Sequence, residues 1–241
     1  MNKLILCEGT TDAILLSYYL ERIAGWKYSR KAPPNLDIKA LNGTETVNWY
    51  RKDDNYLLIS AVGGKDNFRH FFTSRIASPI FNANAFDKIA VITDRDQREI
   101  ASIEKSVEAV LAGIQVDIRN NVWRQGIYDD AYAISRELLV LLVVIPTEHQ
   151  GALEAVMLEA VSEDPYDQRI VDAAGAFAER MRTEASRYIS SDRLKLKAHL
   201  GVTWAVQYPE KVFSLIDEQI RSVKWENSGV LSECFVELIK I

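Results

Sequence analysis

Short apolar runs, each followed by a turn and an amphipathic stretch, are the feature that most constrains what this chain can fold into. The runs at residues 4–7, 56–62 and 89–93 are almost continuously apolar, which is typical of strands that are buried on both faces. Strands of this kind that alternate with helices indicate a parallel sheet with helices on both sides. The sequence therefore predicts an α/β fold with a doubly wound, mainly parallel sheet.

The segments that follow these runs have the apolar spacing of helices. After the turn at residues 9–11, the first predicted helix continues to Gly25, and Thr10 or Thr11 is the expected cap. The other predicted elements of this part are helices at 67–76 and 99–111, a short fourth strand at 116–118, and an irregular stretch at 27–55.

The pattern changes after Asn120. The predicted elements are a weakly signalled hairpin at 122–135, a strand at 137–145, a helix at 151–160, and helices from residue 167 onward with breaks near 190–191 and 208–209. We expect an α/β core of residues 1–120 and a strand and helix extension of residues 121–241. The extension is expected to pack on the core as one compact unit with a C-terminal helical part.

Composition limits the classes of function. A net charge of −5 means that the chain is no polycation, so a nucleic acid would be held by a local basic patch and by metal. Two cysteines, Cys7 and Cys234, are too few for a four-ligand zinc site, and no disulfide dependence is expected. The longest apolar run, at 138–145, is too short to span a bilayer. We expect a cytoplasmic protein that has no contact with membranes.

Carboxylates stand where two of the predicted strands end. Glu8 and Asp12 follow the first run, and Asp94 and Asp96 follow the third. The carboxyl ends of parallel strands meet at one edge of a sheet, where α/β proteins bind ligands. Clustered carboxylates repel each other unless a cation joins them, and Mg²⁺ prefers oxygen ligands. The pairing predicts a site for Mg²⁺, or for Mn²⁺, although either motif by itself is usually a turn or a helix cap.

These motifs resemble those of the Toprim domain. Residues 4–20, an apolar run followed by Glu-Gly-Thr-Thr-Asp and a helix, resemble its first motif, and Ile89–Asp96 resembles its second. Gly63-Gly64 is similar to a glycine turn that is often found between the two. The resemblance covers roughly residues 1–120. It is to small stand-alone Toprim-like proteins of unknown function, which are related to the Toprim domains of OLD-family nucleases and primases.

The resemblance implies metal-dependent cleavage or joining of phosphodiesters in nucleic acid. By the family pattern, Glu8 is a metal ligand or general acid/base, while Asp94 and Asp96 hold Mg²⁺. Asp12 matches the acid that follows the Glu-Gly pair. The catalytic set is therefore Glu8, Asp94 and Asp96, and all four acids belong to the metal set.

Several other residues are candidate additions to this site. Gly63-Gly64-Lys65 could approach a phosphate closely, although it fails the Walker pattern, and a simple turn is the alternative. Glu99 and Glu154 could extend the acidic cluster, with solvated helix charge as the alternative. The basic stretch 180–197 could grip phosphates through Lys195 and Lys197, with an ordinary exposed helix face as the alternative.

What the chain lacks narrows the function. It has little room for the tyrosine-bearing gate of a topoisomerase, too few cysteines for the zinc module of a primase, and no Walker motif. The predicted function is a small metal-dependent nuclease or nucleotidyl-processing enzyme that acts on DNA or RNA, with a separate ATPase as a candidate partner. The alternatives are a non-catalytic nucleic-acid or protein-binding module and a phosphatase-like enzyme with an aspartyl nucleophile. The sequence gives no oligomeric state.

Overall fold

A computed structural model describes residues 2–211 and 216–241. These residues form two compact units. The first comprises the chain up to Val144 together with Phe235–Ile241, and the second comprises Ile145–Cys234.

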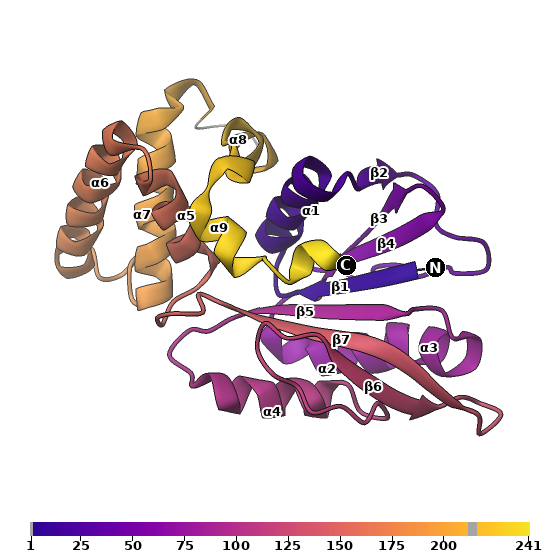
Figure 1. The fold of residues 1–241 in the computed structure, drawn as a ribbon. Helices are drawn as coiled ribbons and strands as arrows, with labels where there is room; N and C mark the ends of the chain where they lie inside the picture. Colours follow the sequence, from indigo (N-terminus) through magenta and orange to yellow (C-terminus); the bar gives the residue numbers. More distant parts are fainter. Residues whose placement is uncertain (1, 212–215) are drawn as a thin grey trace. The chain divides into compact units, whose positions relative to one another are not determined.

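The first unit is built on one seven-stranded sheet with the strand order β2-β3-β4-β1-β5-β7-β6 (Figure 1). β1 pairs in parallel with β4 and with β5, while the β2–β3, β3–β4 and β6–β7 pairs are antiparallel. The strands are β1 (Asn2–Cys7), β2 (Lys27–Ser29), β3 (Thr46–Lys52), β4 (Asn55–Ala61), β5 (Lys88–Asp94), β6 (Arg124–Asp129) and β7 (Ser135–Ile145).

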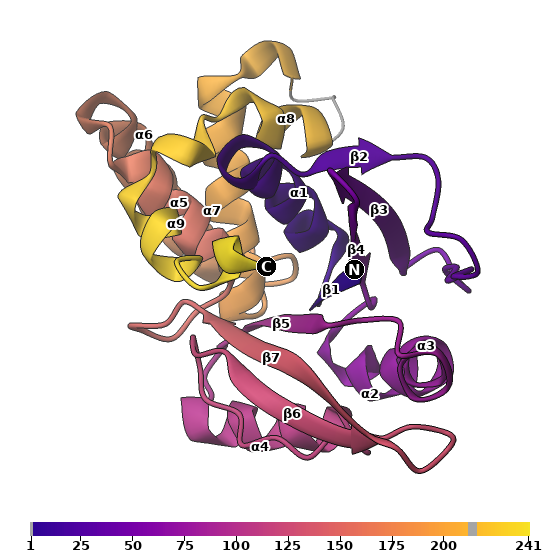
Figure 2. The same ribbon diagram turned by 45° about the vertical axis from the view of Figure 1, so that its right-hand side comes forward.

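Helices cover both faces of this sheet, which confirms the predicted α/β class. α1 lies on one side, and α2, α3 and α4 lie on the other (Figures 1 and 2). Alternate residues of a strand point to opposite faces, and Leu4 and Leu6 accordingly share a buried cluster with Phe71 and Ile103. The helices are α1 (Thr10–Ala24), α2 (Phe68–Phe71), α3 (Ala77–Ala83) and α4 (Ile100–Val110), with a π-helical turn at Phe72–Ile76 and 3-10 turns at Lys65–Asn67 and Leu238–Lys240.

Two local predictions for this unit were wrong. The stretch at 27–55, expected to be irregular, contains β2 and β3. These strands carry charged and half-buried residues at the side of the sheet, so they lack the continuous apolar run that marks β1. The predicted strand at 116–118 is absent, and only isolated bridges at Gln115, Arg119 and Asn120 flank that position.

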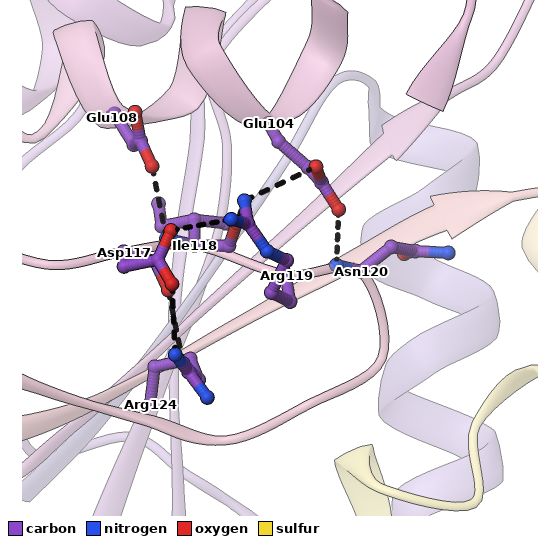
Figure 3. Close-up of polar contacts among 7 residues, drawn as sticks. All are labelled: Glu104, Glu108, Asp117, Ile118, Arg119, Asn120 and Arg124. Carbon is purple, nitrogen blue, oxygen red and sulfur yellow. Dashed lines mark hydrogen bonds and ion pairs between the residues drawn. The ribbon is translucent and has the colours of Figure 1, made fainter. Parts of the chain in front are cut away.

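Side chains of α4, rather than a neighbouring strand, hold the segment 116–120 (Figure 3). Glu108 accepts a hydrogen bond from the backbone N–H of Ile118 at 3.0 Å, and Glu104 accepts one from that of Asn120 at 2.8 Å. Asp117 in turn forms ion pairs with Arg119 at 2.9 Å and with Arg124 at 2.8 Å. Carboxylates thus satisfy backbone donors that a strand would have given to the sheet.

The second unit is helical. Its elements are α5 (Leu153–Ser162), α6 (Pro165–Glu184), α7 (Asp192–Gln207), α8 (Ile216–Ser222) and α9 (Gly229–Cys234), with 3-10 turns at Pro209–Lys211 and Trp225–Asn227. Both predicted breaks are confirmed, because α6 ends before residues 190–191 and α7 ends before Pro209. Trp204 and Trp225 are buried in the interior of this unit. Within the described ranges, no helix is long and apolar enough to cross a membrane.

Candidate functional site

The carboxyl ends of β1 and β5 lie side by side. The two strands pair in parallel up to Cys7 and Ile92, so Glu8 follows directly on the pair. Oε1 of Glu8 accepts a hydrogen bond from the hydroxyl of Thr93 at 2.6 Å and another from the backbone N–H of Asp94 at 3.0 Å. Glu8, at the end of β1, is therefore hydrogen-bonded directly to residues at the end of β5.

Glu8 is almost completely buried, with 3% of its surface exposed. Burial raises the pKa of its carboxyl, because the charged form loses its water, and the negative charge of Asp96 raises it further. The hydrogen bonds from Thr93 and Asp94 and the charge of Lys65 act in the opposite direction. Glu8 is thus a carboxyl that holds a proton more readily than an exposed glutamate does, and an incoming cation would favour its ionised form.

Asp12 closes the turn between β1 and α1. Its Oδ2 accepts a hydrogen bond from the backbone N–H of Gly9 at 3.1 Å. The helix cap is therefore Gly9, and the expectation that Thr10 or Thr11 caps α1 was wrong. The reason is that Asp12, in the first turn of the helix, reaches back to the donor that precedes it.

The glycine turn after β4 joins the same edge. The backbone N–H of Gly64 donates to the carbonyl of Glu8 at 2.8 Å. Gly63 and Gly64 have φ angles of +79° and +117°, which residues with a side chain rarely adopt. A Cβ on Gly63 would also lie 2.5 Å from Oγ1 of Thr44. The two glycines therefore allow a turn that brings the following residue, Lys65, to the ends of β1 and β5.

Lys65 forms an ion pair with Asp96. Asp96 adopts a φ of +51°, a conformation that Asp tolerates better than most residues, and both side chains are partly exposed. A cation supplied by the chain itself therefore stands beside the carboxylates, in contact with Asp96.

The remaining acids lie close to one buried thiol. Burial raises the pKa of Cys7 well above its ordinary value, and the charges of Asp12, Glu8 and Asp94 add to the shift in that order. Asp94 is itself buried. We call Glu8, Asp12, Asp94 and Asp96 together the acidic edge.

The acidic edge is not a closed metal cage. Among the described residues, no group of three or more His, Cys, Asp or Glu side chains is placed so that it could hold a metal ion. Mg²⁺, however, is often bound through one or two carboxylates together with waters and substrate phosphates. Glu8 and Asp96 offer oxygen ligands of this kind, and they follow the neighbouring strands β1 and β5. The chemistry of these residues therefore fits a hydrated Mg²⁺ that has carboxylates among its ligands.

The other predicted additions are placed elsewhere or have other partners. Glu99 is exposed and immediately precedes α4. Glu154 belongs to the second unit, where it is buried and forms an ion pair with Lys197. Lys195, in the same unit, pairs with Glu179 at 2.8 Å. The alternative of solvated helix charge was therefore wrong for Glu154, which has a buried position and a basic partner.

Sequence reasoning missed Thr93 as part of the site. Its hydroxyl donates the shorter of the two hydrogen bonds that Glu8 accepts. The signal was available in principle, because Thr93 is a hydroxyl residue at the end of a strand that is otherwise apolar and immediately precedes Asp94.

Comparisons with known proteins bear on the family and the fold. A family model described as "Protein of unknown function (DUF3226)" matches residues 2–238. The crystal structure of a hypothetical protein from Pyrococcus horikoshii OT3 is similar, with a TM-score of 0.52 and 16% sequence identity over 99% of this chain and 98% of that chain. At that identity the likeness shows a shared fold alone. No curated protein matches the chain.

Proposed function

This chain belongs to DUF3226, a family of proteins of unknown function, and we propose that it carries out Mg²⁺-dependent phosphodiester chemistry on nucleic acid as a small Toprim-like nuclease. One observation carries the proposal. Glu8, at the end of β1, is hydrogen-bonded to the end of β5, with the Asp96–Lys65 pair within electrostatic reach. Buried carboxylates with perturbed pKa values at the carboxyl edge of a sheet are typical of functional sites.

Glu8 is the residue that we assign to proton transfer. Its raised pKa makes the carboxyl a better acceptor for a proton from an attacking water than an exposed glutamate is, and the protonated form can give that proton to a leaving oxygen. Both of its hydrogen bonds from described residues go to Oε1, so they fix the orientation of the carboxyl and leave Oε2 for this work.

Asp96 would hold the metal ion, and Glu8 would be a second ligand through Oε2 when its carboxyl is ionised. When bound, Mg²⁺ or Mn²⁺ supplies positive charge to the phosphodiester and makes a coordinated water more acidic. Asp96 is paired with Lys65 in this structure, so Lys65 would be the cationic group available to contact the phosphate when Asp96 serves as a metal ligand.

The setting that we propose is the cytoplasm. Cys7 and Cys234 are both free, and Cys7 lies buried under the acidic edge. A reducing compartment would keep these thiols in that form.

A non-catalytic binding module is the second candidate. It is favoured by the finding that the described residues include no three-ligand metal group and that Glu8 and Asp96 already have partners within the protein. Such a module would use the glycine turn and Lys65 to approach a phosphate without cleaving it.

The test is cleavage of single-stranded, duplex and structured DNA and RNA by the purified protein with Mg²⁺, with Mn²⁺ and with EDTA. We expect cleavage with metal alone, and we expect Glu8→Gln to reduce it by about 10²- to 10⁴-fold, as loss of a general acid/base does. Asp94→Asn, which neutralises the buried acid at the end of β5 that the Toprim resemblance assigns to the metal, should also abolish cleavage. Glu21→Gln, an exposed acid in the last turns of α1, is the matched control and should leave the rate unchanged.

The outcomes separate the candidates. Metal-dependent cleavage that survives both Glu8→Gln and Asp94→Asn rejects the assignment of the site. Tight binding of nucleic acid by the wild-type protein without cleavage, under every metal condition, favours the binding module.

A further inference from the structure

One face of α6 carries exposed aromatic rings with arginines above them, and we propose that it binds single-stranded nucleic acid by stacking bases on these rings. The inference rests on the proposed function, because it names the form of nucleic acid that the protein acts on. α6 is a long helix of the second unit and runs beside α7 (Figures 1 and 2).

Two rings of α6 recur at a spacing that places them on one face of the helix. Tyr166 and Phe177 have 68% and 43% of their surfaces exposed, and Tyr188, 72% exposed, lies in the turn after the helix. Tyr166 and Phe177 are 11 residues apart, which is close to three helical turns. Tyr166 and Phe177 therefore share a helix face and lie about 16 Å apart at a rise of 1.5 Å per residue. Large aromatic side chains exposed in a row mark a binding surface more often than a fold requirement.

An arginine stands over each ring. The guanidinium groups of Arg169, Arg180 and Arg187 lie 4.9, 5.6 and 5.6 Å from the centroids of Tyr166, Phe177 and Tyr188, respectively. These six residues are the α6 aromatic face.

The charge of these arginines is largely unneutralised. In the part of the chain that the structure describes, no carboxylate lies within ion-pair distance of Arg169 or Arg187, and the acid nearest to Arg180 is Glu184 at 4.0 Å. Residues 165–188 carry four arginines and four acids, so the segment as a whole is neutral and the positive charge is that of the individual arginines. Phosphates are the natural complement to guanidinium groups that lack an acidic partner.

A groove between α6 and α7 continues the same face. It has a volume of about 540 Å³, and its lining includes Tyr166, Arg169, Ile170, Phe177, Val202 and Val206. The apolar lining suits the flat faces of nucleobases, and Arg169 stands in the same wall. A single strand offers unpaired bases and an anionic backbone together, whereas a duplex hides the faces of its bases. We therefore expect single strands to bind more tightly than duplexes.

An acidic amphipathic helix of a partner protein is the competing occupant, because an apolar groove with a basic rim could also receive one. The rings with arginines over them favour the nucleic acid. Two of these pairs lie on α6, and a third, Arg187 over Tyr188, lies outside the lining of the groove, so ring-and-arginine pairs are not limited to a groove that would hold one helix.

The experiment measures the fluorescence anisotropy of a labelled oligothymidylate of about 20 nucleotides, longer than the roughly 4–16 nucleotides that such sites cover. It is done in EDTA, so that binding does not depend on a metal ion. Loss of a stacking platform costs about 1–3 kcal/mol, or about 5- to 150-fold in affinity. We expect Tyr166→Ala/Phe177→Ala to weaken binding at least about tenfold.

Two further variants specify the mode of binding. Tyr132→Ala removes a tyrosine that is 80% exposed in the first unit, between β6 and β7, and should leave affinity unchanged. Arg169→Gln/Arg187→Gln should reduce the slope of log Kd against log salt concentration by about 1–2, because two phosphate contacts are lost.

Each result either supports or overturns the inference. It falls if the wild-type protein does not bind the oligothymidylate, if the double alanine variant binds as tightly as the wild type, or if an acidic helical peptide competes for the groove while the strand does not bind. Failure of the proposed function is seen separately. In that case strand binding in EDTA depends on Tyr166 and Phe177, and Glu8→Gln binds normally, but no metal brings about cleavage.

Discussion

The acidic edge of the first unit and the α6 aromatic face of the second unit carry opposite charges and are held in opposite ways. At the acidic edge, Glu8 accepts two hydrogen bonds, Asp96 is paired with Lys65, and a glycine turn fixes the approach of the loop. On α6, the rings are exposed and their arginines lie over them. A reacting group needs one fixed position, whereas a surface that grips a variable strand needs to adapt. We infer that the reacting groups belong to the first unit and that the surface that binds the strand belongs to the second.

The largest effect on stability is expected at the glycine turn, Gly63-Gly64, which adjoins the acidic edge. Gly63→Ala should lower the free energy of unfolding by about 1–3 kcal/mol, because alanine is strained in the left-handed region and its Cβ would crowd Thr44. Urea denaturation measures the change. Gly43→Ala is the matched control, since nothing lies within 4 Å of a Cβ at that position and its φ is not in the left-handed region.

The α6 aromatic face should tolerate change far better than the glycine turn does. Phe177→Ala is expected to alter the free energy of unfolding by less than about 0.5 kcal/mol, as is usual for exposed positions. If Phe177→Ala destabilises the protein as much as Gly63→Ala does, the face is structural and the contrast between the two regions is lost.

A second difference is expected in the dependence of stability on pH. The pKa of Glu8 is raised in the folded protein, above all by burial. Between the ordinary pKa of glutamate, about 4.3, and this raised value, the folded state binds more protons than the unfolded state. Stability conferred at position 8 is therefore present at low pH and is lost as pH rises through that window. In Glu8→Gln this loss should disappear.

The measurement is urea denaturation of the wild type and of Glu8→Gln across the acidic range, and the quantity compared is the difference in their free energies of unfolding. That difference should decline as pH rises. Added Mg²⁺ should reduce the decline, because a bound cation favours ionised Glu8. A difference that stays constant with pH would show that burial does not raise the pKa of Glu8 in the folded protein.

The central fold was predictable from sequence because β1, β4 and β5 are buried over most of their length and carry mainly apolar residues there. β3 was not, since it lies between the short edge strand β2 and β4, and only two of its seven residues are buried. The segment around Ile118 reads as a strand locally, but Glu104 and Glu108 of α4 take its backbone donors.

The site divides in the same way. The meeting of Glu8 with Asp94 follows from strand ends that lie next to each other in a parallel sheet, so the sequence predicted it. The pairing of Lys65 with Asp96 joins residues that are 31 positions apart, and that of Lys197 with Glu154 joins residues 43 apart. Such pairs depend on how loops and helices return to each other, and spacing in the sequence does not encode that.

The smallest expected effect is on metal affinity, and it tests whether Lys65 occupies the place of a metal ion beside Asp96. Lys65→Met removes the partner of Asp96, and if Lys65 competes with metal for that carboxylate, Mn²⁺ should bind more tightly. A partly exposed ion pair contributes about 0.2–1 kcal/mol, so the gain should be about 1.4- to 5-fold in affinity by calorimetry. Lys105→Met removes the same charge from an exposed position on α4 and controls for net charge. Weaker Mn²⁺ binding in Lys65→Met, with unchanged binding in Lys105→Met, would show instead that Lys65 positions Asp96 for the metal. In that case the acidic edge, like the α6 aromatic face, would need its own cationic side chains in order to bind its ligand.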